Sequence, residues 1–364
     1  MRERRATLAE RLRVQAGHCA SLGSPLYEGL LLRAADDATA GGPLWRVYEG
    51  RDVAAADSAP LALMGAVHRL VLTDRAPGLA RWFPSAAIAV GSEPEPTYPA
   101  GAWPEFLAVV DGLHDDVAAL LDHPIQTNEV GRSAALLGGF LEVARLGLPM
   151  RLAEIGASAG LNLRWDRYRY EDAWGDPASP VRFPAVFAAG GRPSLDVPAI
   201  VVERSGCDRS PVDPTTEDGR LTLMSYVWAD QVERFARLKG AIEVAREVPA
   251  TVERADAFDW LAGRISRRRP GTATVVFHSV VALYFSSDER GRLASMLADA
   301  GGQATADEPL AWLRLEHRDT GDPTAPGWSR LGNPEVRLTA WPGGEERLLA
   351  VSGAHGPPVR WLAG

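Results

Sequence analysis

The chain has 364 residues, of which 46% are hydrophobic and 24% are charged, and its formal net charge is −8. This composition is that of a globular protein, and the length suits two domains or one large α/β domain with an added helical part. No stretch approaches the roughly 20 uncharged apolar residues of a membrane span, so no membrane partner is expected. The acidic balance disfavours nucleic acid as a partner, because phosphate binding requires a local excess of cations.

Residue counts also exclude two cofactor classes. Lys239 is the only lysine, and it lies in an arginine- and glutamate-rich stretch typical of a helix surface. A Walker A loop requires Gly-Lys before Ser or Thr, and a pyridoxal phosphate enzyme requires a Schiff-base lysine, so we expect neither. Cys19 and Cys207 lack metal-ligand spacing, which predicts no metal and fits a reducing compartment. Because residues 1–13 are charged rather than apolar, we expect no secretory signal and a cytoplasmic location.

The first 125 residues predict helices joined by Pro- and Gly-rich connections. Ser24 followed by Pro25 is typical of a helix start, with a side-chain cap and a proline in the first turn. Ser58 begins a second helix through LALMGAVHRLVL, and Pro104 begins a third through FLAVVDGLHDDVAALL, since apolar residues recur every three or four positions. We therefore expect an N-terminal helical domain over residues 1–125.

From residue 126 onward, strand and helix patterns alternate. The β-like runs cover residues 151–155, 199–202, 251–254, 272–277, 311–315, 336–340 and 348–351, and helical patterns at 227–247, 257–265 and 288–300 separate most of them. Such alternation predicts an α/β domain with a Rossmann-like, mostly parallel sheet and helices on both faces. The string WPGGEE joins the last two runs by a tight turn, which predicts a C-terminal antiparallel hairpin.

The predicted second domain, residues 126–364, contains one unusually long interval. Residues 166–226 are rich in Pro, Gly and Asp and exceed an ordinary strand-to-strand connection. We expect an insertion there, forming a hairpin or a lid over the pocket.

A basic run at residues 264–269, RISRRR, departs from the acidic balance of the chain. Because helix C-termini favour cations, we interpret it as a solvated helix end rather than a phosphate contact.

The most informative string is LAEIGASAGLNL, residues 152–163. It places an acidic residue and a glycine-rich turn after a predicted strand and before a predicted helix. Glycines let the backbone approach a ligand, and a helix N-terminus offers unpaired N–H groups. The string resembles motif I of class I S-adenosylmethionine (SAM) methyltransferases, whose loop wraps the amino-acid part of SAM. The resemblance implies a cofactor site that includes Glu154, Gly156, Ser158, Gly160 and Asn162, with Ser158 in place of the usual middle glycine.

The same string also matches the G-x-S-x-G nucleophile elbow of α/β-hydrolases, with Ser158 as the nucleophile. Asp256 or Asp307, together with His355, would complete a triad in the correct chain order. Against this interpretation, the preceding half of the chain looks helical, the following residues are not small, and no HGGG-like oxyanion segment precedes the motif. A strand–turn–helix corner without any ligand is the third interpretation.

Strings spread along the chain resemble a bacterial family described as domain of unknown function 2332. They are GSPLY (23–27), QTNEVGR (126–132), EIGASAGLNL with DRY (154–168), RSGCDRSPVD (204–213), YVWADQ (226–231), ADAFDWL (255–261) and FHSVV (277–281). The resemblance covers almost the full length. It supports the fold more than any one activity.

Three further residues are candidates for the cofactor site under the methyltransferase interpretation. Asp256 follows a predicted strand, where class I methyltransferases often carry an acid that accepts from the adenine amino group. Glu203 ends another predicted strand and would accept from the ribose hydroxyls. Arg132 would pair with the carboxylate of SAM through its guanidinium fork. The alternatives are a helix cap for Asp256 and a surface salt bridge for Arg132.

Candidate catalytic and substrate-binding groups follow other predicted strands. His278 comes directly after the apolar strand TATVVF, at the carboxyl edge of the predicted sheet where ligands bind. A histidine there can remove the proton of a substrate as general base, although a lone buried histidine is more often structural. Asp230 is the second catalytic candidate, with a helix cap as its alternative. The candidate substrate-binding residues are Asp166, Tyr168 and Gln231.

The sequence therefore predicts a SAM-dependent methyltransferase that acts on a small molecule, mainly by positioning two substrates and offering a base. Two alternatives remain: a serine hydrolase that uses Ser158, and a non-catalytic protein that binds a nucleotide-like ligand. Fold resemblance alone does not choose among them. Neither the acceptor nor the oligomeric state is predicted.

Overall fold

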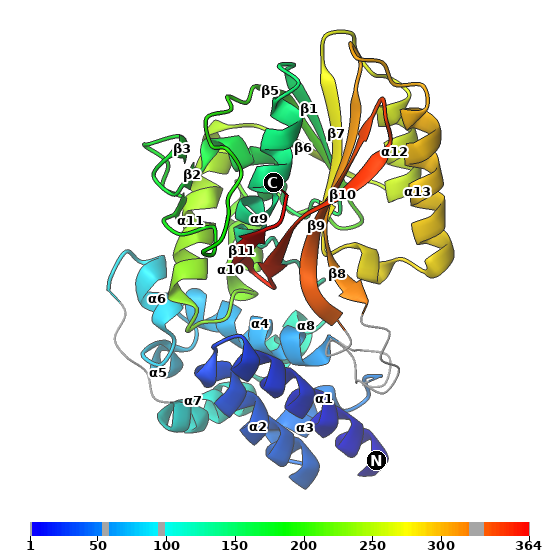
Figure 1. Cartoon of the computed structure of the whole chain (residues 1–364). Helices are drawn as coiled ribbons and strands as arrows, with labels where there is room; N and C mark the ends of the chain where they lie inside the picture. The colour runs from blue at the N-terminus through cyan, green and yellow to red at the C-terminus, as the bar shows by residue number, and fades with distance from the viewer. Residues whose placement is uncertain (1, 53–57, 94–98, 320–330, 364) are drawn as a thin grey trace. The chain divides into compact units, whose positions relative to one another are not determined.

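The computed structural model describes residues 2–52, 58–93, 99–319 and 331–363 (Figure 1). It divides into two compact units, which we call the helical unit (Met1–Thr127 and Thr216–Lys239) and the sheet unit (Asn128–Thr215 and Gly240–Gly364). The second segment of the helical unit falls inside the domain expected to begin at residue 126. No helix in the described ranges is long and apolar enough to cross a membrane.

The helical unit is built from short and medium-length helices around one apolar core. They are α1 (Arg2–Ser21), α2 (Pro25–Ala40), α3 (Pro43–Tyr48), α4 (Ala59–Leu72), α5 (Pro77–Ala80), α6 (Pro84–Ala89), α7 (Pro99–Gly112), α8 (His114–Leu120) and α10 (Glu217–Ser225). Helix α11 (Val232–Glu247) begins in this unit and ends in the sheet unit. The predicted helices at the N-terminus are therefore confirmed in kind.

One predicted helix start and one predicted helix cap are wrong. Pro104 does not begin a helix but lies inside α7, which starts at Pro99. Ser24 precedes α2 as expected, yet its hydroxyl does not cap the helix. Instead, the carboxylate of Asp230 accepts from the Ser24 hydroxyl at 2.6 Å and from the Leu26 backbone N–H at 2.9 Å. A distant acid thus satisfies the first turn of α2, which local sequence patterns do not reveal.

The sheet unit contains an eight-stranded sheet with the order β11-β10-β9-β8-β7-β1-β5-β6. Its strands are β1 (Met150–Ile155), β5 (Val201–Asp208), β6 (Thr251–Arg254), β7 (Ala273–Ser279), β8 (Leu310–Asp319), β9 (Leu331–Trp341), β10 (Glu345–Gly353) and β11 (Gly356–Trp361). The five strands β6, β5, β1, β7 and β8 run parallel, and β9, β10 and β11 continue the sheet antiparallel. The predicted α/β class and the C-terminal hairpin are confirmed.

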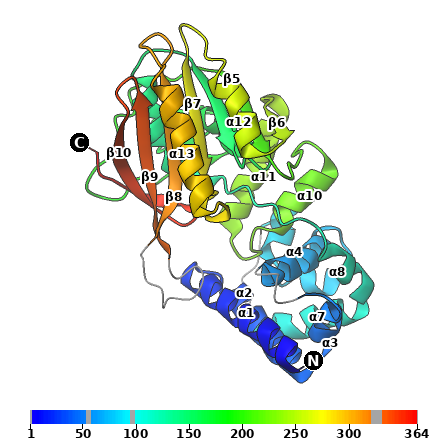
Figure 2. The same ribbon diagram turned by 90° about the vertical axis from the view of Figure 1, so that its right-hand side faces the viewer.

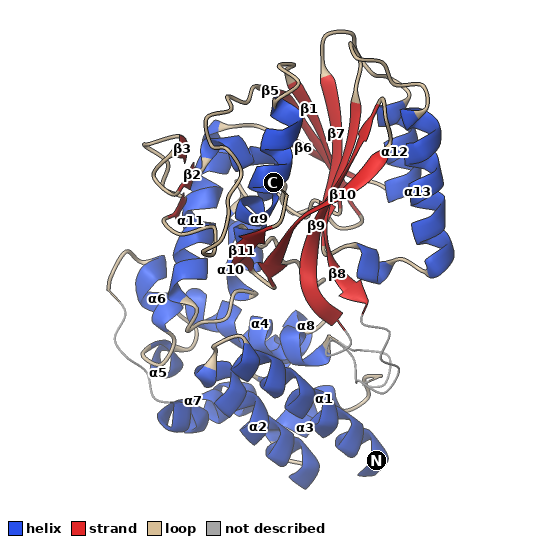
Figure 3. Ribbon diagram, viewed as in Figure 1, coloured by secondary structure: helices blue, strands red, loops and turns tan. Residues whose placement is uncertain are grey.

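Helices cover both faces of this sheet (Figures 2 and 3). Helices α12 (Ala257–Ile265) and α13 (Ser287–Gly301) pack on one face, where Ala153 and Ile155 of β1 join their apolar core. Helix α9 (Gly131–Ala144) packs on the other face, where the ring of Phe140 meets Phe277 of β7 edge to face at 5.1 Å. Because side chains alternate along a strand, Glu154 of β1 points to the α9 face.

The long interval after β1 differs from the expected insertion. Only its first part is separate from the main sheet, as a small three-stranded sheet of β2 (Arg169–Tyr170), β3 (Trp174–Gly175) and β4 (Arg182–Phe183). Its middle part supplies β5, which pairs with β1 in the centre of the main sheet. The sequence prediction placed that strand at residues 199–202, six residues short of its end.

The turn after β1 leads into η1 (Leu161–Arg167), a 3₁₀ segment rather than the predicted α-helix. Its Trp165 ring stacks between Phe140 and Trp174, with centroid distances of 4.4 and 5.0 Å. This aromatic stack fixes the segment against α9. The 3₁₀ turns offer no extended helix N-terminus, so the amides expected there for ligand binding are not arranged in that way.

Candidate functional site

The strand order places a topological switch point between β1 and β7. From β1 the chain moves outward to β5 and β6 on one side, whereas β7 and β8 lie on the other side. In open parallel sheets, ligands bind in the crevice outside the carboxyl ends of the strands at such a point. Glu154 lies one residue before the end of β1 and is in register with Phe277 of β7. We call this region the carboxyl edge.

The loop after β1 has an unusual backbone. Gly156, Ser158 and Gly160 all have positive φ angles, of 66°, 52° and 67°. A β-carbon on Gly156 would lie 2.6 Å from a methyl group of Val281, in the loop after β7. The two loops at the switch point therefore touch, and the glycine permits that approach. Ser158 is the residue that carries backbone strain, because a side chain disfavours the left-handed region.

Asp208, at the end of β5, holds this loop in place. One of its carboxylate oxygens accepts from the backbone N–H of Ser158 at 2.9 Å, and the other accepts from that of Ser210 at 2.8 Å. The sequence prediction missed Asp208 because it ended the strand too early and selected Glu203 as the terminal acid. The sequence signal for Asp208 was the string RSGCDRS, in which an acid is followed by polar residues typical of a turn.

Among the acids of the carboxyl edge, Glu154 has the most strongly shifted pKa. Its side chain is buried, with 2% of its surface exposed, and its Oε2 has no hydrogen-bond partner among the described residues. Burial raises the pKa of the carboxyl well above its ordinary value of 4.5, and the nearby carboxylate of Asp208 adds to the rise. The charges of Arg132 and Arg164 and a hydrogen bond with Asn162 oppose it. Burial prevails, so the carboxyl favours its neutral form.

Two further residues act on the Glu154 carboxyl: Arg132, which precedes the motif in sequence, and Asn162, which lies within it. Arg132, in the first turn of α9, donates to the backbone carbonyl of Ser279 at 3.0 Å. Asn162 is buried in η1, and its side-chain oxygen accepts from the Ser133 hydroxyl at 2.6 Å. The structure therefore brings Glu154, Arg132, Asn162 and the glycine loop together.

Both ring nitrogens of His278 form hydrogen bonds, one with Trp312 and the other with Glu316. The indole N–H of Trp312, on β8, donates to Nε2 at 3.1 Å. Because an indole can only donate, Nε2 carries the lone pair and Nδ1 carries the proton, which is directed to Glu316 at 2.6 Å. The other contacts of the Glu316 carboxylate are the backbone N–H groups of Val281 and Ala282, at 3.0 and 3.2 Å. This arrangement fixes the loop after β7 rather than presenting a free base.

Glu203 lies away from Glu154, whereas Asp256 follows β6 at the carboxyl edge as a helix cap. Glu203 is near the amino end of β5, where it pairs with Arg151 of β1 at 2.8 Å. This is the edge of the sheet opposite to Glu154. Asp256 caps α12, and one of its carboxylate oxygens accepts from the backbone N–H of Phe258 at 2.9 Å. The cap was the structural alternative to adenine recognition.

Two predicted substrate-binding residues, Asp166 of η1 and Tyr168 directly after it, form hydrogen bonds within the sheet unit. Asp166 forms a two-pronged ion pair with Arg204, with both distances at 2.7 Å. Tyr168 is fully buried and donates from its hydroxyl to the Leu161 carbonyl at 2.6 Å. Both contacts tie η1 to the body of the sheet unit.

Asp230 and Gln231 belong to the helical unit, whereas all other predicted site residues belong to the sheet unit. Asp230 caps α2 as described above, and the Gln231 amide donates to the Leu22 carbonyl at 2.8 Å.

The same unit contains a buried histidine that sequence reasoning missed. His68 contacts the Ser85 hydroxyl at 2.7 Å and the Ser225 carbonyl at 3.1 Å. Burial lowers its pKa to about 4, so it is neutral near pH 7.

Asp307, one of the two acids offered for the hydrolase alternative, lies at the other edge of the sheet from Ser158. Asp307 accepts from the backbone N–H of Gly271 at 3.2 Å, in the segment that precedes β7. It therefore lies at the amino edge of the sheet, whereas Ser158 follows the carboxyl end of β1. In the part of the chain that the structure describes, no group of three or more His, Cys, Asp or Glu side chains could hold a metal ion.

The chain belongs to the family of uncharacterized proteins conserved in bacteria, domain of unknown function 2332, whose model matches residues 9–361. This confirms the resemblance inferred from the scattered strings. No curated protein and no solved structure is significantly similar to the chain.

Proposed function

We propose that the chain is a SAM-dependent methyltransferase acting on a small molecule, with the cofactor held at the carboxyl edge. The observation that carries this proposal is the buried Oε2 atom of Glu154, which lacks a hydrogen-bond partner among the described residues. Buried polar atoms are normally satisfied, so an exception at a topological switch point suggests a missing ligand group.

The charges around Glu154 suit the amino-acid part of SAM. A neutral buried carboxyl becomes ionised when a cation arrives, because an opposite charge favours the charged form. The ammonium group of SAM would supply that cation, and Arg132, whose charge acts on Glu154, would pair with the SAM carboxylate through its fork. An acid and an arginine at one site match a zwitterion better than they match a simple anion or cation.

Asp208 offers a second point of attachment. Its two carboxylate oxygens each accept one backbone N–H from the loop residues Ser158 and Ser210. Each carboxylate oxygen can accept more than one hydrogen bond, so Asp208 can hold the loop and still accept from a ligand hydroxyl. Its position at the end of β5, beside β1, is that of the ribose-binding acid in Rossmann folds. We therefore assign to Asp208 the role that the sequence suggested for Glu203.

When bound, SAM would supply an electrophilic methyl group for a substrate oxygen or nitrogen. The chain would contribute positioning, because methyl transfer needs the acceptor and the methyl group in line. The pair of His278 and Glu316 would act as positioning residues that set the loop after β7. The lone pair of His278 Nε2 is used by Trp312, so the catalytic base is sought elsewhere.

Calorimetric titration with SAM and with S-adenosylhomocysteine tests this proposal. We expect micromolar binding to the wild type and at least about tenfold weaker binding to Glu154→Gln, because a neutral amide cannot become an anion. The isosteric amide resembles the protonated carboxyl, so the fold should persist. Glu345→Gln changes an exposed glutamate of β10 and serves as the matched control.

The outcomes separate the candidate functions. Absence of binding to the wild type at millimolar SAM would overturn the methyltransferase proposal. Labelling of Ser158 by a fluorophosphonate probe, lost in Ser158→Ala, would favour the hydrolase instead. SAM binding without turnover of any acceptor in a broad screen would favour a non-catalytic binding protein.

A further inference from the structure

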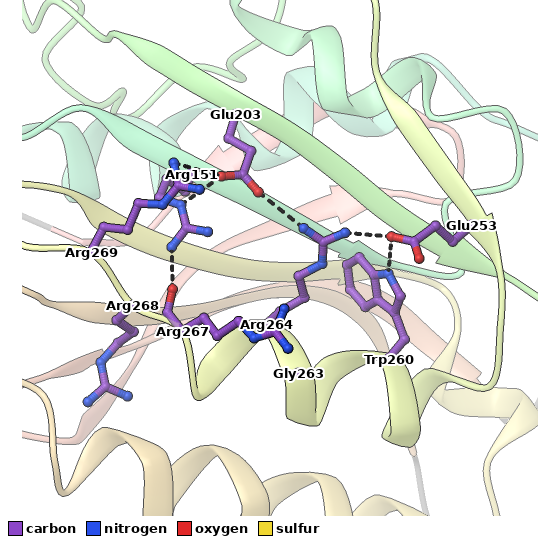
Figure 4. Close-up of a pocket in the computed structure, with 9 residues that line it drawn as sticks. All are labelled: Arg151, Glu203, Glu253, Trp260, Gly263, Arg264, Arg267, Arg268 and Arg269. Atoms are coloured by element: carbon purple, nitrogen blue, oxygen red, sulfur yellow. Dashed lines mark hydrogen bonds and ion pairs between the residues drawn. The ribbon is translucent and has the colours of Figure 1, made fainter.

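A cavity of about 570 Å³ opens on the α12 face of the sheet unit (Figure 4). Arg151 and Glu203 line it at the amino edge of the sheet, and Glu253, in register with Cys207, lines it farther along β6. Its walls come from the first residues of β1 and β5, from β6, and from α12 with the segment that follows it. The side chains around it include five arginines: Arg151, Arg264, Arg267, Arg268 and Arg269. We call this cavity the arginine pocket.

The arginine pocket is strongly cationic in an acidic chain. Its only acidic side chains are Glu203 and Glu253, so five positive and two negative charges give a local net charge of +3, against −8 for the whole chain. Charge of this sign and density in a concave site attracts anions and raises their local concentration. The size lies within the range of about 300–1,000 Å³ that is common for small-molecule sites.

The two glutamates organise the arginines without neutralising them. Glu203 contacts Arg151 at 2.8 Å, Arg264 at 3.1 Å and Arg269 at 3.7 Å. The hydrogen bond from Arg151 holds the pKa of Glu203 below its ordinary value, so this carboxylate is ionised at neutral pH. Arg264 also forms an ion pair with Glu253. Two carboxylates thus face three guanidinium groups, and one of those charges is in excess.

The remaining arginines differ in how firmly they are held. Arg268 points away from Glu203 and donates to the carbonyls of Ala300 and Gln303 at the end of α13, at 3.0 and 2.8 Å (Figure 4). Arg267 contributes its backbone carbonyl to Arg151 at 2.9 Å, and its side chain is exposed. The exposed Arg269 contacts Glu203 at 3.7 Å, and the exposed side chain of Arg267 also lines the pocket.

We propose that the arginine pocket binds a small anion that carries at least two phosphate groups. Guanidinium forks match phosphate oxygens in pairs, and several forks around one cavity can engage adjacent phosphates at once. A single phosphate would leave part of the +3 charge uncompensated. This site lies on the α12 face, whereas Glu154 points to the α9 face, so it is separate from the cofactor site proposed above and goes beyond that function.

The test is calorimetric titration of the full chain with pyrophosphate, with ATP and with inorganic phosphate. The test variant is Arg267→Gln/Arg269→Gln, which removes two exposed charges and leaves the fixed Arg151–Glu203 pair intact. The matched control is Arg33→Gln/Arg360→Gln, which removes two exposed charges on α2 and β11. We expect pyrophosphate and ATP to bind the wild type and the control equally, and the test variant at least about tenfold more weakly.

Inorganic phosphate should bind at least about tenfold more weakly than pyrophosphate, because it engages fewer forks. Tighter binding of ATP than of pyrophosphate would assign the phosphates to a nucleotide, and equal binding would assign them to a free polyphosphate. Equal affinity for phosphate and pyrophosphate, no heat with any of the three, or an unchanged affinity in the test variant would overturn the proposal. So would binding of a short single-stranded oligonucleotide without binding of pyrophosphate.

Discussion

The two edges of the sheet unit use the same strand in opposite ways. At the carboxyl edge, the last residue but one of β1 is Glu154, a buried acid whose pKa is raised by burial. At the amino edge, Arg151 begins the same strand and pairs with Glu203, whose pKa is lowered by that contact. The acid at the carboxyl edge is buried, and the charges at the amino edge are already paired in part.

The two edges also differ in how closely other atoms pack around a glycine with a positive φ angle. At the carboxyl edge, a β-carbon on Gly156 would collide with Val281. At the amino edge, Gly271 has a similar φ of 72°, but nothing lies within 4 Å of the corresponding position. The surroundings of Gly156 are therefore closely packed, and those of Gly271 are open.

The largest expected difference is between two glycine substitutions. Both Gly156→Ala and Gly271→Ala place a side chain in the left-handed region, at a cost of about 1–2 kcal/mol each. Gly156→Ala also forces a clash with the stiff, β-branched Val281, which adds about 1–3 kcal/mol. Urea unfolding of the two variants measures the difference. Equal destabilisation would mean that the surroundings of Gly156 are as open as those of Gly271.

The second contrast is the response of stability to pH when Glu154 is replaced. A carboxyl whose folded pKa is raised contributes stability that is fully present below its unfolded pKa, near 4.5, and lost as pH rises through the folded value. Wild type should therefore lose about 1.4 kcal/mol relative to Glu154→Gln for each pH unit between the two pKa values. Unfolding free energies across the acidic to neutral range give this slope. A constant difference between the proteins would contradict it.

Replacing Glu203 should have the opposite pH dependence. A carboxyl whose folded pKa is lowered contributes stability that is present above its unfolded pKa and lost as pH falls through the folded value. Glu203→Gln should thus cost about 1–2 kcal/mol near neutral pH, between the values of surface and buried ion pairs, and less in acid. Unfolding free energies of this variant and of Glu345→Gln, measured at both pH values, test the sign. A cost that grows in acid would refute the assignment.

The smallest expected effect concerns the carboxyl edge alone. Trp312→Phe removes the donor to His278 Nε2 and keeps an aromatic ring beneath Arg314. Loss of this one hydrogen bond should cost about 1 kcal/mol. The nitrogen chemical shifts of His278 should report the change at Nε2, with Nδ1 still bound to Glu316. Unaltered stability and shifts would show that the Trp312 contact does not hold the ring.

Periodicity predicted most of the fold because it reports which residues are buried. Helix α12 and strand β6 occupy the predicted residues. The extension of β5 to Asp208 was missed because RSGCD contains polar residues and a glycine, although its register with β1 buries Ser205, Gly206 and Cys207. Strand β11 was missed because Pro357 and Pro358 interrupt the strand pattern. It is the outermost strand of the sheet, where prolines are tolerated.

The candidate site was predictable only where its residues are close in sequence. The motif supplied Glu154, the glycine loop and Asn162, which the structure places together with Arg132. Sequence patterns do not reveal the partners of Asp230 and His278, because Ser24 and Glu316 come from distant segments. The basic run at residues 264–269 was expected to be a solvated helix end. Its role in the arginine pocket depends on Arg151 and Glu203, which only folding brings beside it.

The central claim is that the carboxyl of Glu154 is neutral until a cationic ligand group binds beside it. Calorimetric titration with SAM, repeated near neutral pH in buffers that differ in ionisation enthalpy, counts the protons exchanged on binding. The account predicts that the wild type releases a proton as Glu154 ionises, and that Glu154→Gln, titrated with enough SAM to approach saturation, releases none. Binding to the wild type without proton release, or with the same release in the variant, would contradict it.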